Sequence, residues 1–239
     1  MRIRDAGVLI TGGSQGLGRA LAHALAAKGA RVAIAARGRA ALEAVAAEIT
    51  ERGGTAHALR CDVGDPQAAY ALAARAASLA GPIDLLINAA STLGEVPLPV
   101  LLDARAEDVE RVFQVNLLGP FRLTKAVAGQ MVVRGAGLVL NLSSDAAVEA
   151  YPGWGAYGAS KAALDHLTRI WAAELEPAGV QLISIDPGEM NTQMHADALP
   201  DADPKTLAAP GAVAEWIVER IEAADSLAAG VRLSAEVAA

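Results

Sequence analysis

Two kinds of segment alternate along the chain: short apolar runs rich in valine, isoleucine and leucine, and longer alanine-rich amphipathic stretches. The short runs predict strands at 8–11, 31–36, 56–60, 83–88, 138–143, 182–186 and 231–234. The longer stretches predict helices at 17–28, 39–52, 66–79, 106–133, 156–176 and 211–224. Several strands are apolar throughout, as in strands covered on both faces. Because helices separate the strands, the sequence predicts a doubly wound α/β fold with a parallel sheet of about seven strands.

The length of 239 residues suits one α/β domain, and neither a linker nor a repeat divides the chain. We therefore predict a single domain over 1–239. The only long irregular segment predicted is 187–210, which contains four prolines. A segment of that length without regular structure is usually functional, and we interpret it as a loop that covers a substrate.

The composition excludes several classes of partner. The formal net charge is −7, whereas a nucleic-acid-binding surface needs clustered Lys and Arg. The longest stretch without a charged residue, 6–18, is short and rich in glycine, so no membrane span is predicted. Residues 1–7 carry no apolar signal segment, and a single cysteine, Cys61, rules out a disulfide framework. We expect a cytoplasmic protein that binds neither nucleic acid nor a membrane.

Three glycines follow the first predicted strand, at positions 12, 16 and 18. The first permits a tight turn, the second lets the backbone approach a pyrophosphate, and the third lets a helix pack closely on the sheet. The N–H groups and the positive end of the helix then bind the anion. An ordinary glycine-rich turn is the alternative, but the position between strand and helix favours a dinucleotide site. Its predicted members are Gly12, Ser14, Gln15, Gly16, Leu17 and Gly18.

The end of the second predicted strand bears on the choice between NADP and NAD. A site for NAD usually has an acidic residue about 20 positions beyond the glycines, where it binds the ribose 2′-hydroxyl. The segment 33–39 contains no carboxylate; it contains Arg37 at the strand tip and Arg39 two residues later. A guanidinium binds a 2′-phosphate through two hydrogen bonds, so we predict NADP(H), with NAD(H) the less favoured cofactor. A solvated loop arginine is the alternative.

A tyrosine and a lysine, Tyr157 and Lys161, stand four residues apart at the start of a predicted helix. That spacing places them on one helix face, one turn apart. A phenol with a pKa near 10 is a poor acid–base group at neutral pH, but a nearby ammonium favours the phenolate. Lowering that pKa by about 3 units requires roughly 4 kcal/mol. A surface pair is the alternative for this spacing taken alone.

The glycine pattern and the Tyr157–Lys161 pair resemble the short-chain dehydrogenase/reductase family, and further segments match it in order from about residue 7 to residue 192. The resemblance implies a Rossmann-type dinucleotide-binding and catalytic domain. Asp62 and Val63 correspond to the segment that contacts adenine, and Asn88 to the end of the fourth strand. Further cofactor contacts are implied for Tyr157, Lys161, Pro187, Gly188 and Thr192, and a catalytic tetrad for Asn116, Ser144, Tyr157 and Lys161.

The roles implied by the resemblance are consistent with the chemistry of these residues. Tyr157 would exchange a proton with the substrate oxygen while hydride moves between the substrate and NADP(H). Ser144 would donate a hydrogen bond to that oxygen, and Lys161 would lower the pKa of Tyr157. Asn116 would hold a water that links Lys161 to solvent. The expected substrate is a small carbonyl compound or secondary alcohol, and the alternative is a non-catalytic NAD(P)-binding regulatory protein.

The sequence departs from the family pattern after the fourth predicted strand. Ala89 replaces an asparagine and Ser91 replaces a glycine. Ser91 either crowds the cofactor site or adds a hydrogen bond to it. The four histidines share no metal-ligand spacing with one another or with Cys61, so no metal is expected.

The helices predicted at 106–133 and 156–176 are long enough to form dimer or tetramer interfaces, which the family commonly has. Small residues on these helices would permit close pairing, and we predict a homodimer or homotetramer. Solvated surface helices are the alternative. The small residues are Ala126, Ala128, Gly129, Ala162, Ala163, Ala172 and Ala173.

Overall fold

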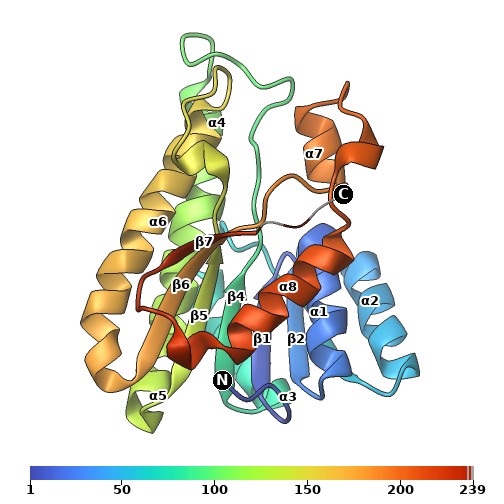
Figure 1. Ribbon diagram of the computed structural model, residues 1–239, viewed down its shortest axis with the longest axis vertical. Coiled ribbons are helices and arrows are strands. Elements are labelled where there is room, and N and C mark those ends of the chain that lie inside the picture. Colours follow the sequence, from blue (N-terminus) through green and yellow to red (C-terminus); the bar gives the residue numbers. More distant parts are fainter. Residues whose placement is uncertain (236, 238–239) are drawn as a thin grey trace.

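The computed structural model describes residues 1–235 and 237. Within them seven strands form one sheet in the order β3-β2-β1-β4-β5-β6-β7, and every pairing is parallel (Figure 1). The chain winds outward from β1 toward β3, then returns to β4 and winds the other way, so the fold is doubly wound as predicted. The strands are β1 (Gly7–Thr11), β2 (Arg31–Ala36), β3 (Thr55–Arg60), β4 (Ile83–Asn88), β5 (Gly137–Leu142), β6 (Val180–Asp186) and β7 (Arg232–Ser234).

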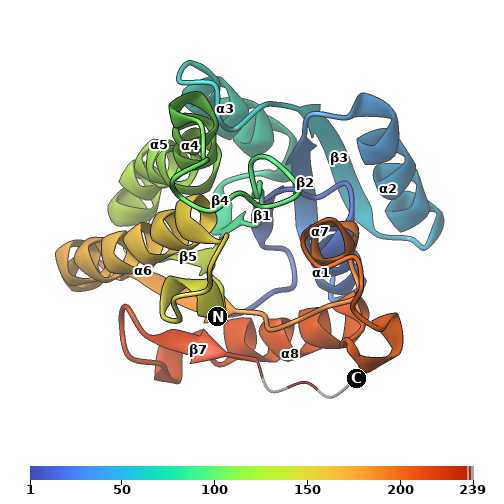
Figure 2. The same cartoon turned by 90° about the horizontal axis from the view of Figure 1, so that it is seen from above.

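Helices cover both faces of the sheet, as Figure 2 shows from above. The larger ones on one face are α1 (Gly16–Ala27), α2 (Arg39–Glu51) and α8 (Pro210–Glu222). The larger ones on the other face are α3 (Ala68–Ala80), α5 (Gly119–Arg134) and α6 (Gly155–Leu175). Two shorter helices, α4 (Ala106–Phe113) and α7 (Gln193–Ala198), lie toward the end of the molecule where the strands terminate (Figure 1).

The sheet is buried on both faces because its apolar side chains alternate between two cores. In β1, Val8 and Ile10 belong to the core beneath α1 and α8. Leu9, between them, belongs to the core beneath α3 and α5. All three side chains are fully buried. The two-residue period of a strand therefore explains why the sequence shows a continuous apolar run rather than an alternating one.

The helix predicted at 106–133 is wrong as a single element. The chain forms α4, then a π-helical turn over Gln114–Leu118, then α5. Pro120 stands in the first turn of α5, where its missing N–H costs no hydrogen bond, but it cannot continue the ladder of a preceding α-helix. The turn matters for the site because it contains Asn116.

The prediction that 187–210 is the only long irregular segment is also wrong. Residues 89–105, between β4 and α4, form a second long segment without a helix or strand. The 187–210 segment itself contains α7 and a short 3₁₀ turn over Pro204–Thr206. Thr192 caps α7, because its hydroxyl accepts a hydrogen bond from the N–H of His195 at 3.3 Å.

Some small residues expected on a pairing surface lie in the protein's own core instead. Ala128 is 4% exposed and Ala172 is 1% exposed, and both are therefore unavailable to a partner. Gly129 is exposed on α5. The oligomeric state stays a prediction. Positions 236, 238 and 239 of the predicted single domain lie outside the described residues. Among the described residues, no helix is both long and apolar enough to span a membrane.

Candidate active site

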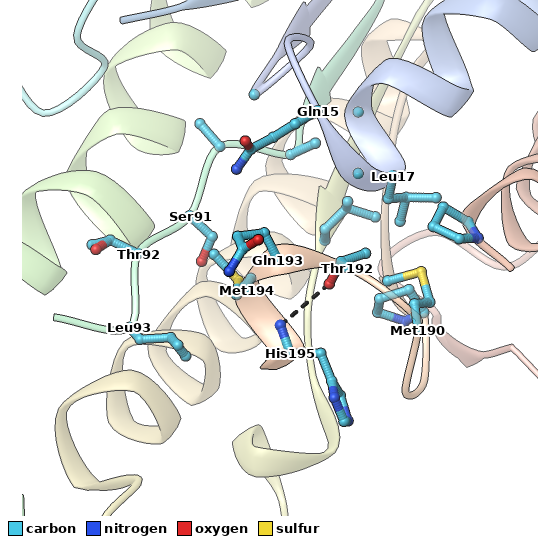
Figure 3. Close-up of a pocket in the computed structure, with 18 of the residues that line it drawn as sticks. Gln15, Leu17, Ser91, Thr92, Leu93, Met190, Thr192, Gln193, Met194 and His195 are labelled. Atoms are coloured by element: carbon cyan, nitrogen blue, oxygen red, sulfur yellow. Dashed lines mark hydrogen bonds between the residues drawn. The ribbon is translucent and has the colours of Figure 1, made fainter. Parts of the chain in front are cut away.

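A cleft of about 1290 Å³ opens at the carboxyl ends of the strands. Its walls come from the start of α1, the segment after β4, the end of β5, the start of α6 and the 187–210 segment. The close-up in Figure 3 shows three of these walls: Gln15 and Leu17 at the start of α1, Ser91 and Leu93 after β4, and Met190 to His195 around α7. In a doubly wound fold this edge of the sheet, on either side of the switch between β1 and β4, is where ligands bind.

The glycines after β1 form the floor of this cleft at places where a side chain would collide with backbone. Gly12 has a φ of +70°, and a Cβ there would lie 2.8 Å from both Ala89 O and Ala90 N. A Cβ on Gly18 would strike the Gly12 carbonyl, with its carbon only 2.8 Å away. The Gln15 cap of α1 forms no side-chain cap hydrogen bond, and the first turn contains no acidic residue. These features fit the pyrophosphate of a dinucleotide, whose oxygens would accept hydrogen bonds from the N–H groups in the first turn of α1.

The end of β4 is held against β1 and β5 by buried polar side chains. The Thr11 hydroxyl accepts hydrogen bonds from Ala89 N and Ala90 N, each at 3.1 Å. The Asn88 amide donates to Asn141 Oδ1 at 2.8 Å, and Asn141 donates to Thr168 at 2.8 Å. Asn88 is 2% exposed and does not line the cleft, so it lies behind the cleft wall and not in it, where a cofactor-binding residue was predicted. Its contacts orient the chain that forms the cleft wall.

The far end of the cleft is lined by Arg37, Arg52, Asp62 and Val63. Within the described chain Arg37 forms no ion pair, whereas Arg39 pairs with Glu43 at 2.7 Å and does not line the cleft. Asp62 accepts hydrogen bonds from Gly64 N at 2.9 Å and from Arg111 at 2.7 Å. Burial acts to raise the pKa of Asp62, but these hydrogen bonds and the charges of Arg111 and Arg37 outweigh it and lower the pKa.

Tyr157 and Lys161 both enter the cleft from one face of α6, as their spacing predicts. The Lys161 Nζ lies 5.5 Å from the centre of the Tyr157 ring and donates to Leu142 O at 2.7 Å. Burial raises the pKa of Tyr157 to about 12, against smaller effects of the Ser144 and Ser91 hydroxyls that lower it. Burial likewise lowers the pKa of Lys161 to about 8, although Asp165 and Asp186 act to raise it. Both shifts favour the neutral forms, as expected for groups removed from water.

Ser144 lies at the end of β5, with its hydroxyl beside the carboxylate that follows it in sequence. Ser144 Oγ donates to Asp145 Oδ1 at 2.9 Å and accepts from Ala146 N at 3.2 Å. The other carboxylate oxygen of Asp145 accepts from the Tyr151 hydroxyl at 3.1 Å. Asp145 also acts to raise the pKa of Tyr157 through its charge.

Asn116 is 1% exposed and clamps the segment after β4. Its Oδ1 accepts from Thr92 N at 2.9 Å and from Ser91 Oγ at 3.2 Å. Its Nδ2 donates to Thr92 O at 2.9 Å and to Ser160 Oγ at 3.1 Å. The side chain is thus occupied by protein partners, so a water held by Asn116 would have to bind its main chain.

The 187–210 segment closes one side of the cleft. Pro187, Gly188 and Thr192 line it, and a Cβ added to Gly16 would lie 3.5 Å from the Thr192 methyl group. Thr192 therefore lies near the glycine segment as well as capping α7. Met194 and Trp154 pack against the cluster of Leu93, Ala146 and Tyr157, which gives this end of the cleft an apolar wall.

The sequence did not predict a role for Asp145 or Arg232, and it marked Ser91 only as a departure from the family pattern. Arg232, on β7, donates to Asp165 at 3.0 Å, to Asp186 at 3.1 Å and to Ser144 O at 2.9 Å. It therefore ties the backbone of Ser144 to the two carboxylates near Lys161. No spacing in the sequence relates β7 to that serine, so only the fold brings them together. Among the residues that the structure describes, no group of three His, Cys, Asp or Glu side chains could hold a metal ion.

The site and fold define a dinucleotide-binding α/β protein, and comparison with known proteins identifies its family. Residues 6–203 match the family model described as short chain dehydrogenase. A short chain dehydrogenase of Pseudocercospora fijiensis is 37% identical over 191 residues, 79% of this chain and 60% of that relative. The NADPH-dependent aldehyde reductase-like protein, chloroplastic, of Arabidopsis thaliana is 34% identical over 200 residues, 79% of this chain and 74% of that relative.

A solved structure extends the likeness to the whole fold. It is a 7 alpha-hydroxysteroid dehydrogenase complexed with NADH and 7-oxo glycochenodeoxycholic acid, with a TM-score of 0.88 and 29% identity. The match covers 98% of this chain and 94% of that chain. The chain belongs to the short-chain dehydrogenase/reductase family, whose members are oxidoreductases that transfer hydride with NAD(P).

Proposed function

We propose that the protein is an NADP(H)-preferring reductase of small carbonyl compounds, with Tyr157 as the proton donor. The observation that carries the proposal is that Tyr157, Lys161 and Ser144 line one cleft together with the glycines after β1, which are Gly12, Gly16 and Gly18. Bound NADP(H) would supply the hydride, or accept it in the reverse reaction. A protein that only senses a nucleotide has no need of a buried phenol and a buried ammonium side by side, which argues against the regulatory alternative.

The direction of the pKa shift at Tyr157 supports a role as proton donor rather than proton acceptor. With its pKa raised to about 12 by burial, the Tyr157 hydroxyl is protonated at neutral pH and ready to donate. The pKa of Lys161 is lowered to about 8, so the Lys161 side chain is still mostly protonated, and therefore charged, at pH 7. That charge, together with the hydroxyl groups near Tyr157, would stabilise the phenolate left after proton donation.

Ser144 and Asn116 would act on the geometry of this exchange. The Ser144 hydroxyl would turn from Asp145 to the substrate oxygen and stabilise the charge that develops there. Asn116 would fix the chain at Thr92, so that the wall opposite Tyr157 keeps its position. A water that relays protons at Asn116 would have to bind the Asn116 main chain, because the side chain is occupied by protein partners.

The preference for NADP(H) rests on cations at the far end of the cleft. Arg37 and Arg52 both line it, and neither forms an ion pair within the described part of the chain. A 2′-phosphate would give a guanidinium a bidentate partner. The relatives do not agree on the cofactor, since the name of one includes NADPH and the solved structure of another contains NADH. The arginines of this chain are therefore the basis of the proposal.

The wall near Tyr157 supports an apolar carbonyl compound or secondary alcohol as the substrate class. Leu93, Trp154 and Met194 belong to the apolar cluster around Tyr157, and all three line the cleft. A homodimer or homotetramer and a cytoplasmic location remain predictions. The relative from Arabidopsis thaliana is described as chloroplastic, so membership of the family does not by itself predict a cytoplasmic location.

Two experiments test the proposed function. A panel of ketones, aldehydes and alcohols is assayed by nicotinamide absorbance with NADPH and with NADH, for the wild type and for Tyr157→Phe. We expect turnover by the wild type and a loss of at least about 100-fold in Tyr157→Phe. Tyr157→Phe at wild-type rates would overturn the role of the phenol.

The cofactor preference is tested separately with Arg37→Ala. We expect NADPH binding to weaken by about tenfold or more, because a charge-assisted hydrogen bond is lost, while NADH binding changes little. Equal weakening for both cofactors would refute the 2′-phosphate assignment. Arg39→Ala is the matched control, since Arg39 lies two residues away but pairs with Glu43 and does not line the cleft.

A further inference from the structure

Arg232 lies on β7, the edge strand beside β6, and bonds to three other parts of the chain (Figure 1). Its Nε donates to Asp165 Oδ2 at 3.0 Å, and its Nη2 donates to Asp186 Oδ2 at 3.1 Å and to Ser144 O at 2.9 Å. Asp165 is on α6 and Asp186 ends β6, and both are buried. One guanidinium, with its several donors, therefore serves two buried carboxylates from different elements.

Lys161 stands one helical turn before Asp165 and has N–H groups to spare. Its Nζ donates to Leu142 O at 2.7 Å, and an ammonium carries three donors. Asp165 Oδ1 is buried and, within the described residues, has no hydrogen-bond partner. Oppositely charged side chains four residues apart on a helix commonly pair. In the part of the chain that the structure describes, however, Lys161 forms no ion pair, and Asp165 pairs with Arg232 instead.

Arg232 and a serine hydroxyl hold Asp165 by its other oxygen. Asp165 Oδ2 accepts from Ser143 Oγ at 2.7 Å as well as from Arg232. Asp186 Oδ1 accepts from the N–H of Gly188 at 3.1 Å. Without Arg232, the hydrogen bonds left to each carboxylate in the described structure would come from neutral groups. Because a buried charge without a counter-charge is costly, both carboxylates would attract the ammonium on α6.

We propose that Arg232 is a positioning residue that keeps the Lys161 ammonium beside Tyr157. It does so by occupying the carboxylates of Asp165 and Asp186, either of which would otherwise draw the ammonium away. The Lys161 Nζ lies 5.5 Å from the centre of the Tyr157 ring. The charges of the cluster balance, with two carboxylates against one guanidinium and one ammonium, and the guanidinium takes both carboxylates. The inference rests on the proposed function, because an ammonium displaced toward a carboxylate would no longer stabilise the phenolate of the proposed reaction.

The acid–base properties of the cluster are consistent with this role. Burial lowers the pKa of Lys161 to about 8, while the charges of Asp165 and Asp186 act to raise it. Asp145, after β5, acts on the pKa of Tyr157. Burial thus outweighs the two carboxylates while the guanidinium is bonded to both. If an ion pair with either carboxylate formed, the pKa of Lys161 would rise, because the pair would favour the charged form.

Three variants separate the charge of Arg232 from its place in the fold. Arg232→Gln removes the charge and keeps a polar side chain, and the cluster-neutral variant Arg232→Gln/Asp165→Asn/Asp186→Asn removes both carboxylates as well. Arg134→Gln is the matched control, because the Arg134 side chain is 29% exposed, against 27% for Arg232. Arg134 also donates to a main-chain carbonyl, at 2.6 Å, and pairs with a carboxylate, at 3.4 Å. Those partners are at the start of β4, the end of the sheet opposite the cleft.

The titration of Lys161 is followed without turnover, in protein labelled with carbon-13 lysine. The chain has four lysines, and Lys161→Met assigns the Lys161 Cε signal by its loss. We expect a midpoint near pH 8 in the wild type and in Arg134→Gln. In Arg232→Gln the midpoint should rise by at least about one pH unit, and in the cluster-neutral variant it should return to the wild-type value or below.

An unchanged Lys161 midpoint in Arg232→Gln would overturn the proposal. So would a raised midpoint that persists in the cluster-neutral variant, because loosening of the fold, rather than the freed carboxylates, would then account for it. If Arg232→Gln does not fold, Asp186→Asn is compared with Arg232→Gln/Asp186→Asn, in which one carboxylate and one ammonium balance. The midpoint should be higher in the double variant, and equal midpoints would refute the inference.

Turnover separates this inference from the proposed function. With an active wild type, kcat should fall about three- to tenfold in Arg232→Gln and stay unchanged in Arg134→Gln. If no carbonyl compound or alcohol is turned over, the proposed function fails, while the lysine titration still decides the role of Arg232. If the wild type is active and Tyr157→Phe is not, but the Lys161 midpoint is the same in Arg232→Gln as in the wild type, the inference alone fails.

Discussion

Lys161 is a cation that the fold buries, and its burial predicts how the stability of the protein changes with pH. The residue is 3% exposed, and its Nζ donates a hydrogen bond to Leu142 O at 2.7 Å. Burial lowers its pKa from 10.5 to about 8, even though the charges of Asp165 and Asp186 favour the ammonium. The folded state therefore binds the proton less tightly than the unfolded chain does.

The sign and size of the effect follow from this difference. Below about pH 8 both states hold the proton, and the folded state bears the full cost of a buried ammonium. Between about pH 8 and the unfolded value of 10.5 the folded protein releases the proton first, so its stability rises with pH. From pH 7 to about pH 9.5 the gain from this one residue is about 2 kcal/mol.

The perturbation is Lys161→Met, which keeps the length of the side chain and removes the titrating amine. Urea unfolding is measured at pH 7 and at about pH 9.5 for the wild type, for Lys161→Met and for Lys125→Met, an exposed lysine on α5. Burial raises the pKa of Cys61 to about 11, which opposes the gain at alkaline pH, but this contribution is common to all three proteins.

We therefore expect the stability difference between wild type and Lys161→Met to shift by about 2 kcal/mol in favour of the wild type at the higher pH. Lys125→Met should follow the wild type. Parallel pH dependence of the wild type and Lys161→Met would refute the reasoning, because it would mean that the Lys161 ammonium is as well solvated in the fold as in the unfolded chain.

Two further substitutions test the glycines after β1 and the acid–base groups, and a third, at Gly129, is the control for the first. Gly18→Ala should destabilise the fold by about 1–3 kcal/mol and weaken NAD(P)(H) binding, because its Cβ meets the Gly12 carbonyl. Thermal unfolding measures the first effect and cofactor fluorescence the second. Gly129→Ala, also within a helix but with open space around its Cβ, should instead stabilise by about 0.5–1 kcal/mol. Asp145→Asn removes a charge that acts to raise the pKa of Tyr157, so the Tyr157 limb of the pH profile should move to lower pH. A limb that stays in place would show that this charge is screened.

Much of the sheet was predictable because burial on both faces leaves a direct trace in the sequence. The strands predicted at 31–36 and 83–88 match β2 and β4 at both ends. Each is bounded by residues that stop a strand: Gly29 before the first, Gly81 and Pro82 before the second. The other strands differ by one or two residues at one end or, for β5, by one residue at each end. There, pairing with a neighbour, rather than composition, decides the boundary.

The breaks in regular structure were less predictable, because they depend on contacts between distant segments. Residues 106–133 have a continuous helical pattern, yet the chain inserts a π turn that carries Asn116 to the segment after β4. The four hydrogen bonds of the Asn116 side chain join it to that segment and to α6. These contacts exist only in the folded protein, so the spacing of apolar residues contains no sign of them.

The same distinction applies to the electrostatics of Tyr157. Sequence spacing predicts that Lys161 lies beside it, and the fold places them together. Spacing does not predict that burial is the largest effect on both groups, moving the Tyr157 pKa to about 12 and the Lys161 pKa to about 8. Both shifts are toward the neutral form, so the phenol keeps its proton beside the neighbouring ammonium. In the proposed reaction Tyr157 therefore starts as the acid. The hydroxyls of Ser144 and Ser91, which act to lower its pKa, would then help to stabilise the phenolate.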